Sequence, residues 1–329
     1  MASTTASSPL SRLPVLRPAD PAPADGGFAW AVTGAHLWIL VGLFLDGWFH
    51  IHRGDNESFF TPWHAILYSG VGVTVALHLW RARQVGGTSP GYAPSLAGGV
   101  VVLAAGVVDG VWHTVLGIEA DLEALLSPPH LLLITAGTLV FAGPLRAALS
   151  APVGRGLPTA FSAAFVVTGL GFFTQYANPY THLNPVVTTE GPAIAELREV
   201  AGVSGLVLWA VLVAGSVALL KARTALVAGS LAVAVAVPAV FMTTQQGHYA
   251  FVPSILVAAA LTEIAGRRLS PALTALVATT AIATGWVLTL AATQELAWSL
   301  ELLTGSIGSA AAAGYLIGWL VQGGSPRRA

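Results

Sequence analysis

Long apolar stretches separated by short polar segments run through almost the whole chain. A helix needs about 20 predominantly apolar residues to cross roughly 30 Å of hydrocarbon. Stretches of this kind lie at 29–50, 62–81, 94–115, 128–149, 157–176, 200–220, 224–245, 249–266, 271–292 and 304–322. The pattern therefore predicts an all-α fold, a polytopic membrane helix bundle of about ten transmembrane helices.

Basic residues fall on alternate sides of these ten stretches. They are Arg12 and Arg17, Arg81 and Arg83, Arg146 and Arg155, Lys221 and Arg223, Arg267 and Arg268, and Arg327 and Arg328. The loops on the other side hold two basic residues, Arg53 and Arg198, among many acidic ones. Because cytoplasmic loops carry an excess of Lys and Arg, we predict a multi-pass protein of the plasma membrane with both termini in the cytoplasm.

Composition agrees with a membrane protein and limits its chemistry. Of the 329 residues, 55% are hydrophobic and 9% are charged, whereas soluble domains carry roughly 25% charged residues. The formal net charge of −1 gives no support for a nucleic-acid partner. The chain has no cysteine, which excludes disulfides and thiolate metal ligands.

The chain divides into four predicted parts. Residues 1–27 lack the apolar core of a signal peptide and are expected to form a disordered cytoplasmic tail. Residues 28–150 form four transmembrane helices, and residues 151–322 form six more. Residues 323–329 form a second cytoplasmic tail.

One polar pattern occurs twice, at the extracytoplasmic ends of two consecutive helical hairpins, about 29–81 and about 94–149. Asp46-Gly-Trp-Phe-His50 is matched by Asp109-Gly-Val-Trp-His113, and Thr61-Pro62-Trp63-His64 is matched by Ser127-Pro128-Pro129-His130. Asp46 directly follows the apolar run WILVGLFL, and carboxylates within a membrane mark functional sites by default. The duplication indicates a tandem two-helix repeat within the first four helices.

The spacing of these residues predicts a metal site in each repeat. Asp and His four residues apart share one helix face, about 5–6 Å between Cβ atoms. Thr or Ser before Pro suits a helix start, which puts the second His in the first turn of the next helix. The predicted ligand sets are Asp46, His50 and His64, and Asp109, His113 and His130. Two His and one carboxylate can bind zinc, copper or non-haem iron with positions open for substrate.

At these residues the chain resembles the C subunit of the particulate methane and ammonia monooxygenases, which are copper-containing membrane enzymes. The resemblance covers residues 40–137 and lies in Asp46-x-x-x-His50, in Asp55 to His64 ending Thr-Pro-Trp-His, and in His113-Thr114 followed by Pro128-Pro129-His130. It implies that both ligand sets are copper sites. Asp109 stands where that family has Asn, and the last six helices have no counterpart, so methane or ammonia oxidation is not implied.

Other polar residues receive structural interpretations. His36 and His78 lie within the first two spans and are expected to make interhelical contacts, with a proton path as a hypothesis should His36 face the side of Asp46. Residues 175–182 are expected to cover the extracytoplasmic face as a loop. Glu263 lies four residues before Arg267, a spacing typical of a helical ion pair.

The sequence therefore predicts a copper-binding membrane protein, acting either as a monooxygenase-like oxidoreductase or in copper handling. The alternative function is a proton-coupled transporter that uses the Asp/His pairs. The same residues could instead form a proton relay or serve purely as polar packing between helices. Expected partners are the lipid bilayer and, from the runs of small residues, further copies of the chain or other membrane subunits.

Overall fold

The computed structural model describes residues 26–53, 59–117, 122–150 and 156–323. Within these ranges the chain is helical and has no β-sheet; one isolated bridge joins Val186 and Leu296. The long helices are α1 (Gly26–Arg53), α2 (Pro62–Val85), α3 (Ala93–Leu116), α5 (Pro128–Phe141), α6 (Gly143–Ser150), α7 (Leu157–Phe173), α8 (Pro192–Arg223), α9 (Ser230–Gln246), α10 (Val252–Gly266), α11 (Pro271–Thr293) and α12 (Leu300–Gly323). Short turns are α4 (Glu123–Leu126), η3 (Gln175–Ala177) and η4 (Tyr249–Phe251). The all-α prediction is confirmed, and 1–25 and 324–329, which hold most of both predicted tails, lie outside the described residues.

Helix length and hydropathy confirm a multi-pass membrane protein. Within the described residues, seven helical segments are long and apolar enough to cross a membrane, namely α1, α2, α3, α8, η4 with α10, α11 and α12. The bent pair α5 and α6 forms an eighth candidate. The apolar helices α7 and α9 are shorter, at 17 residues each. Nine of the ten predicted stretches therefore overlap one main helix each, and the stretch 128–149 overlaps the bent pair α5 and α6.

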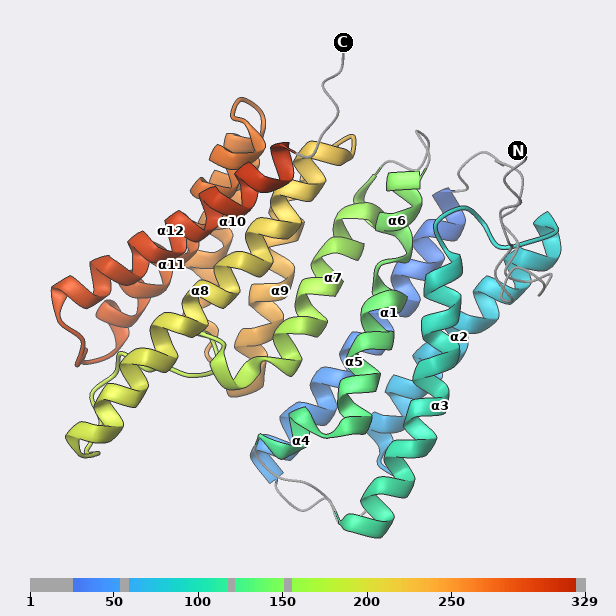
Figure 1. The fold of residues 1–329 in the computed structure, drawn as a ribbon, viewed down its shortest axis with the longest axis horizontal. Helices are drawn as coiled ribbons and strands as arrows, with labels where there is room; N and C mark the ends of the chain where they lie inside the picture. Colours follow the sequence, from blue (N-terminus) through green and yellow to red (C-terminus); the bar gives the residue numbers. More distant parts are fainter. Residues whose placement is uncertain (1–25, 54–58, 118–121, 151–155, 324–329) are drawn as a thin grey trace, which may run out of the picture.

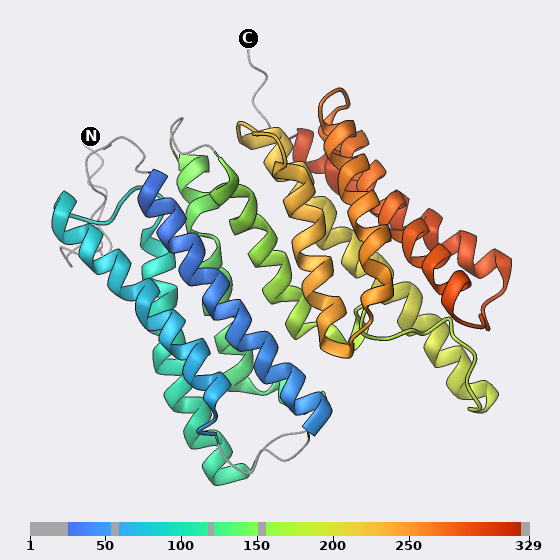
Figure 2. The same ribbon diagram turned by 180° about the vertical axis from the view of Figure 1, so that it is seen from behind.

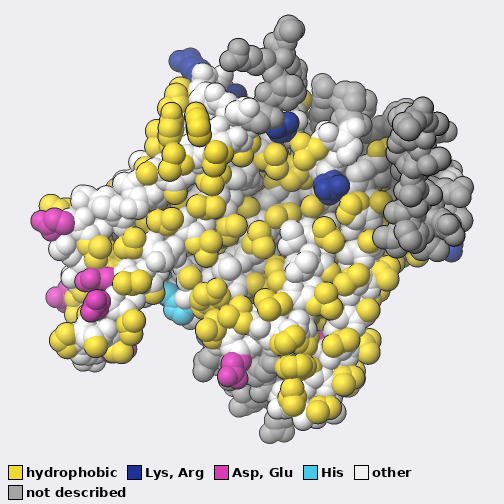
Figure 3. Space-filling model, in the orientation of Figure 1, with side chains coloured by type: hydrophobic (Ala, Val, Ile, Leu, Met, Phe, Trp, Pro, Cys, Tyr) yellow, Lys and Arg dark blue, Asp and Glu magenta, His cyan; other side chains and the backbone are white. Residues whose placement is uncertain are grey.

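The helices form two groups joined through α7 (Figures 1 and 2). Helices α1 to α6 make up the first group, in which α1 packs on α2 and α3 packs on α5. In the second group, α8 to α12, α12 packs on both α8 and α11. Helix α7 packs against α1 and α5 on one side and against α9 on the other. Figure 3 shows the surface hollowed between the two groups at one end.

That end of the bundle, where α1 ends and α2 begins, is called the site end below, and the opposite end is the basic end. Figure 3 shows Lys and Arg near the basic end and Asp and Glu near the site end. Exposed basic residues at the basic end include Arg83, Arg146, Arg223, Arg267 and Arg268. Exposed acidic residues at the site end include Glu123, Glu190, Glu196, Glu295 and Glu301. The charge asymmetry predicted from the loops is therefore present in the fold.

Glycines let α1 and α2 approach closely. A Cβ at Gly42 would lie 2.5 Å from the backbone nitrogen of Leu67, and a Cβ at Gly70 would lie 3.0 Å from that of Ile39. Small residues at such contacts allow the close helix packing that stabilises bundles in lipid. The two contacts also fix the antiparallel register of the first hairpin, and with it the relative height of every side chain on these helices.

Serines from neighbouring helices satisfy the backbone where α5 and α6 bend by 46°. Ser95 of α3 donates a hydrogen bond to the carbonyl of Val140, 2.8 Å away. Ser162 of α7 donates to the carbonyl of Phe141 at 2.5 Å and accepts from the amide of Leu145 at 3.1 Å. Side chains of this kind make a helix break tolerable within lipid. The bend fixes Phe141, which lines the cavity described next.

Candidate metal centre

All six predicted ligands line one cavity of about 610 Å³ near the site end. The first set, Asp46, His50 and His64, comes from α1 and α2. The second set, Asp109, His113 and His130, comes from α3 and α5. The deeper wall is apolar and consists mainly of Ile39, Leu43, Leu67, Val71, Val102, Leu133, Ile134, Val140 and Phe141. The two repeats therefore converge on one chamber with a polar end and an apolar floor.

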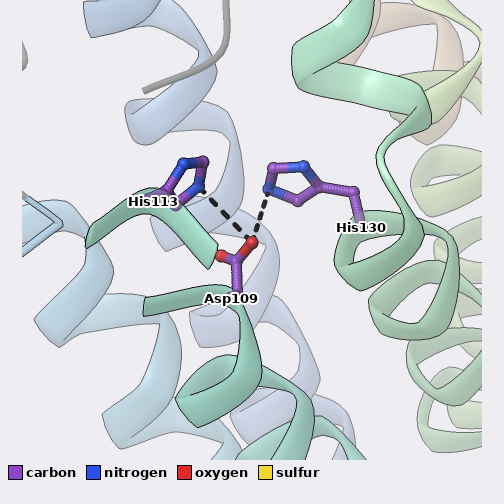
Figure 4. A group of neighbouring side chains, drawn as sticks. All are labelled: Asp109, His113 and His130. Carbon is purple, nitrogen blue, oxygen red and sulfur yellow. Dashed lines mark ion pairs between the residues drawn. The ribbon is translucent and has the colours of Figure 1, made fainter. Parts of the chain in front are cut away.

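In the second set, two imidazoles converge on one buried carboxylate (Figure 4). The Oδ1 atom of Asp109 lies 3.4 Å from Nε2 of His113 and 3.6 Å from Nε2 of His130. One ligand atom from each of the three residues lies within 4.8 Å of the other two, the one such group of His and acidic residues among the described parts of the chain. Asp109 itself is 1% exposed, and a negative charge buried this deeply is stable only beside a positive charge.

The first set repeats this arrangement in a more open form. The Oδ1 atom of Asp46 lies 3.7 Å from Nε2 of His50 and 3.4 Å from Nε2 of His64. The side chain of His50 is 36% exposed, whereas that of His113, its counterpart, is 9% exposed. The carboxylate contacts both imidazoles, but the three residues do not form a group as compact as the second set.

Three of the four imidazoles present Nε2 to the carboxylates while Nδ1 is engaged elsewhere. Nδ1 of His64 lies 2.6 Å from the carbonyl oxygen of Phe59, and Nδ1 of His113 lies 3.4 Å from that of Gly117. A carbonyl only accepts hydrogen bonds, so these Nδ1 atoms carry the proton and a neutral ring keeps a lone pair on Nε2. Nδ1 of His130 lies 2.8 Å from the hydroxyl of Ser127, which can also accept. Metal-binding histidines commonly donate their other ring N–H in this way.

The four distances between Nε2 and carboxylate oxygens, 3.4 to 3.7 Å, suit a shared cation. A direct hydrogen bond between imidazolium and carboxylate would be about 2.7–2.9 Å long. Ligand atoms bound tetrahedrally at about 2.1 Å from one zinc-like ion lie about 3.4 Å from one another. The donor types and the spacing in the second set therefore fit a metal ion.

The glycine after each aspartate lets an aromatic ring pack beside the set. A Cβ at Gly47 would lie 2.6 Å from the ring of Phe172, and a Cβ at Gly110 would lie 3.3 Å from the ring of Phe59. Phe59 lies between the sets, with its ring centre 4.7 Å from that of His64 and 6.1 Å from that of His113. The repeated Asp-Gly pair thus positions both the acid and the aromatic wall.

The two helix starts hold their histidines differently. Thr61 caps α2, since its hydroxyl accepts the backbone N–H of His64 at 3.2 Å. Ser127 occupies the same position before α5 but contacts the ring of His130 instead of a backbone amide. In the second repeat the capping residue therefore orients a predicted ligand directly.

Several cavity residues escaped the sequence analysis. Tyr68 follows His64 by four residues and so shares its helix face; its ring packs on Gly106, where a Cβ would lie 2.7 Å from the hydroxyl oxygen. The spacing of four residues from His64 was the one sequence feature that could have identified Tyr68 as a cavity residue. Residues 175–182, predicted as a covering loop, contribute Gln175, Tyr176, Thr181 and His182 to the lining, as α9 does through Gln246. Desolvation and the nearby Arg198 and His248 lower the pKa of His182.

Other singled-out residues have structural roles. His52, two residues after His50, is exposed, stacks on the ring of Trp48 and hydrogen-bonds the carbonyl of Trp48 at 2.9 Å, away from the site. Glu263 does not pair with Arg267 as predicted. Its carboxylate accepts backbone N–H groups at the start of α9, those of Gly229 at 3.1 Å and Leu231 at 3.0 Å among them. Four acidic residues between the paired helices lie outside the described residues: Asp55, Glu57, Glu119 and Asp121.

Fold and site together define a multi-pass membrane protein with a group of two histidines and one aspartate that can hold a metal ion. Comparison of the chain with protein-family models, curated proteins and solved structures gave no match.

Proposed function

We propose that this protein is a copper-binding membrane oxidoreductase whose metal cavity opens at the extracytoplasmic face. The observation that carries the proposal is the convergence of two Asp/His/His sets on one cavity, with a buried carboxylate 3.4 and 3.6 Å from two Nε2 atoms. The second set is the primary site, and the first set is a second, more open one.

Copper is supported by the resemblance to the copper membrane monooxygenases over residues 40–137. The donor set itself also suits zinc and non-haem iron, so the metal has to be identified by analysis. Asp109 would supply the negative charge, and His113 and His130 would supply neutral nitrogen ligands. A bound redox metal would supply the oxidation chemistry.

The apolar floor of the cavity supports a small apolar substrate together with dioxygen as the reactants of a monooxygenase-like reaction. Pockets that bind small molecules are largely apolar, with few polar groups that fix orientation. Here the polar groups lie at one end and the aliphatic and aromatic side chains at the other. A copper-storage or copper-delivery site has no need of such a floor.

The orientation follows from charge. The basic end carries the exposed Arg residues and the site end the exposed Glu residues, and cytoplasmic loops are the basic ones. We therefore propose ten spans, in which α7 and α9 are counted with the longer helices and both termini are cytoplasmic.

Metal analysis of the purified full chain tests the proposal. We expect wild-type protein to retain copper through dialysis, His113→Ala to lose most of it, and the double variant His50→Ala with His113→Ala to lose all of it. His52→Ala is the matched control, because His52 is two residues from His50 and bonds Trp48 instead of the carboxylate. Its metal content should equal that of wild type.

The outcomes separate the remaining functions. No retained metal in wild type, or equal loss in His52→Ala, would contradict the proposal and favour a transporter or a structural role for the Asp/His pairs. Stoichiometric zinc or iron would replace copper while keeping the site. Retained copper without oxygen consumption in the presence of an electron donor and small alkanes or alkenes would favour copper handling.

A further inference from the structure

Two histidines lie in the first hairpin beyond the cavity floor. His36 of α1 is fully buried, and His78 of α2 is 2% exposed. Neither ring nitrogen of His36 has a hydrogen-bond partner among the described residues, and the same holds for Nε2 of His78. Burying a polar group without a hydrogen bond destabilises a fold. An apolar side chain would therefore serve packing better than His36 does, and ionisable groups inside a membrane are functional by default.

The register of α1 and α2 orders these groups along the bundle. Because Ile39 lies against Gly70, the antiparallel hairpin places His36 level with the turn that contains Thr74. His78 is then five residues, or about 7.5 Å at 1.5 Å per residue, nearer the basic end. The two imidazoles are close enough to interact electrostatically. The order from the site end is therefore cavity, His36, His78, basic end.

Aromatic rings cover both ends of this pair. On the cavity side, the ring of Phe141 lies edge-on to His36, with centres 5.6 Å apart, and Phe141 also lines the cavity. On the other side, the rings of Phe28 and Tyr92 lie 5.7 and 5.5 Å from His78. The guanidinium of Arg81 lies 5.8 Å from the centre of the Phe28 ring. The pair is therefore one side chain away from the cavity and one side chain away from the basic end.

We propose that His36 and His78 form a proton path between the basic end of the bundle and the cavity that holds both ligand sets. Imidazole suits this role because its neutral ring has both a protonated nitrogen and a basic nitrogen, so it can accept a proton and pass one on. The pair lies between the cavity and the basic end, buried on both sides, which is the placement that such a path requires.

The hydrogen bond of His78 defines the steps. Its Nδ1 lies 2.8 Å from the carbonyl oxygen of Thr74 and therefore keeps its proton. A proton arriving from the basic end binds the lone pair on Nε2 and makes His78 a cation. His78 passes the Nε2 proton to the neutral His36 and returns to its starting form. His36 then releases the proton on its other nitrogen towards the cavity, and rotation of the ring resets it.

The use of the path rests on the proposed function, because a buried metal centre that changes its charge needs a route for protons. The existence of the path does not rest on it, since no ligand of either set takes part. Proton transfer can therefore be measured on metal-free protein, separately from metal binding.

The experiment uses the full chain, without metal, in vesicles that contain a pH-sensitive dye. A potassium gradient with valinomycin sets a membrane potential that drives protons inward. We expect wild-type vesicles to acidify faster than protein-free vesicles, and His36→Leu and His78→Leu to acidify at the protein-free rate. His52→Leu, the same change at an exposed histidine outside the path, should keep the wild-type rate.

Folding and polarity are controlled separately. Because His36 makes no hydrogen bond, His36→Leu should unfold at a temperature equal to or above that of wild type and should retain bound copper. His36→Gln keeps a polar side chain that cannot relay protons, and it should also acidify at the protein-free rate. Wild-type acidification at the protein-free rate, or wild-type rates in His36→Leu and His36→Gln, would overturn the proposal. Proton flux without metal binding would refute the proposed function but not the path.

Discussion

The hydroxyl of Ser127 offers a sensitive test of the second set, because it contacts the ring of a predicted ligand without being one. It lies 2.8 Å from Nδ1 of His130 and is 6% exposed. Ser127→Ala removes this contact while leaving all three ligands in place. The ring of His130 then loses the partner that holds its Nε2 towards Asp109, 3.6 Å away.

The size of the effect follows from this geometry. Loss of a hydrogen bond that orients a metal-binding histidine weakens affinity about 10- to 100-fold, or about 1.4–2.7 kcal/mol. Ser127 makes no capping hydrogen bond to the backbone of α5, so the helix itself should lose little. The expected result is a 10- to 100-fold weaker site in a protein of nearly unchanged unfolding temperature.

Thr61→Ala is the matched control for this change. Thr61 occupies the same position in the first repeat, but its hydroxyl caps α2 through the amide of His64. Its loss should lower stability by about 1 kcal/mol and leave the affinity of the second set unchanged. Competition titrations with a chromophoric copper chelator and thermal unfolding in detergent measure the two quantities. Equal affinities for Ser127→Ala and wild type, or equal weakening of the second set by both variants, would refute the reasoning.

Three further predictions concern the scaffold. Glu263→Gln should lower stability by about 1–3 kcal/mol, because a charged acceptor for amides at the start of α9 is lost; unchanged thermal unfolding would contradict this role. Gly106→Ala should cost about 1–3 kcal/mol by displacing the Tyr68 ring, whereas Gly72→Ala, at a helical position with open space, should not lower the unfolding temperature. The pKa of His182 is lowered in the fold, so the unfolded chain binds this proton at higher pH and stability falls as the pH drops below about 6.5. His182→Gln should lose less stability between about pH 7 and pH 5 than wild type does, and equal losses would argue against the shift.

The sequence predicted the helices well because lipid leaves few alternatives. A chain in hydrocarbon must satisfy its backbone within each helix, so an apolar stretch of sufficient length identifies a helix by itself. The start of α8 was less evident. The apolar pattern placed this span at residues 200–220, yet the helix begins at Pro192. Its first turns extend beyond the apolar stretch, where polarity no longer distinguishes helix from loop.

The bend between α5 and α6 could not be predicted. Pro144 was visible in the sequence, but the apolar pattern continues across it. The groups that stabilise the break, the hydroxyls of Ser95 and Ser162, come from α3 and α7. Contacts between residues this far apart in the chain leave no local pattern.

For the site, local spacing predicted which groups meet within each repeat. Asp109 contacts His113 because they are four residues apart on one helix, and it contacts His130 because the next helix is antiparallel and adjacent. That the two repeats share one cavity was not predictable. The shared cavity depends on how α2 and α3 pack against each other. The rings of Phe59 and Tyr68 fill the space between these helices and lie against two glycines of α3, Gly110 and Gly106. The second set is compact and the first set is open because their side chains are buried to different extents. The two motifs are similar in sequence and do not reveal this difference.

X-ray absorption spectroscopy of the copper-loaded protein tests the central claim most directly. We expect nitrogen and oxygen neighbours at about 2.0–2.2 Å with the outer-shell scattering of two imidazoles, and loss of one imidazole contribution in His113→Ala. Copper spectra without imidazole scattering, or spectra that His113→Ala leaves unchanged, would contradict a metal centre built on Asp109, His113 and His130.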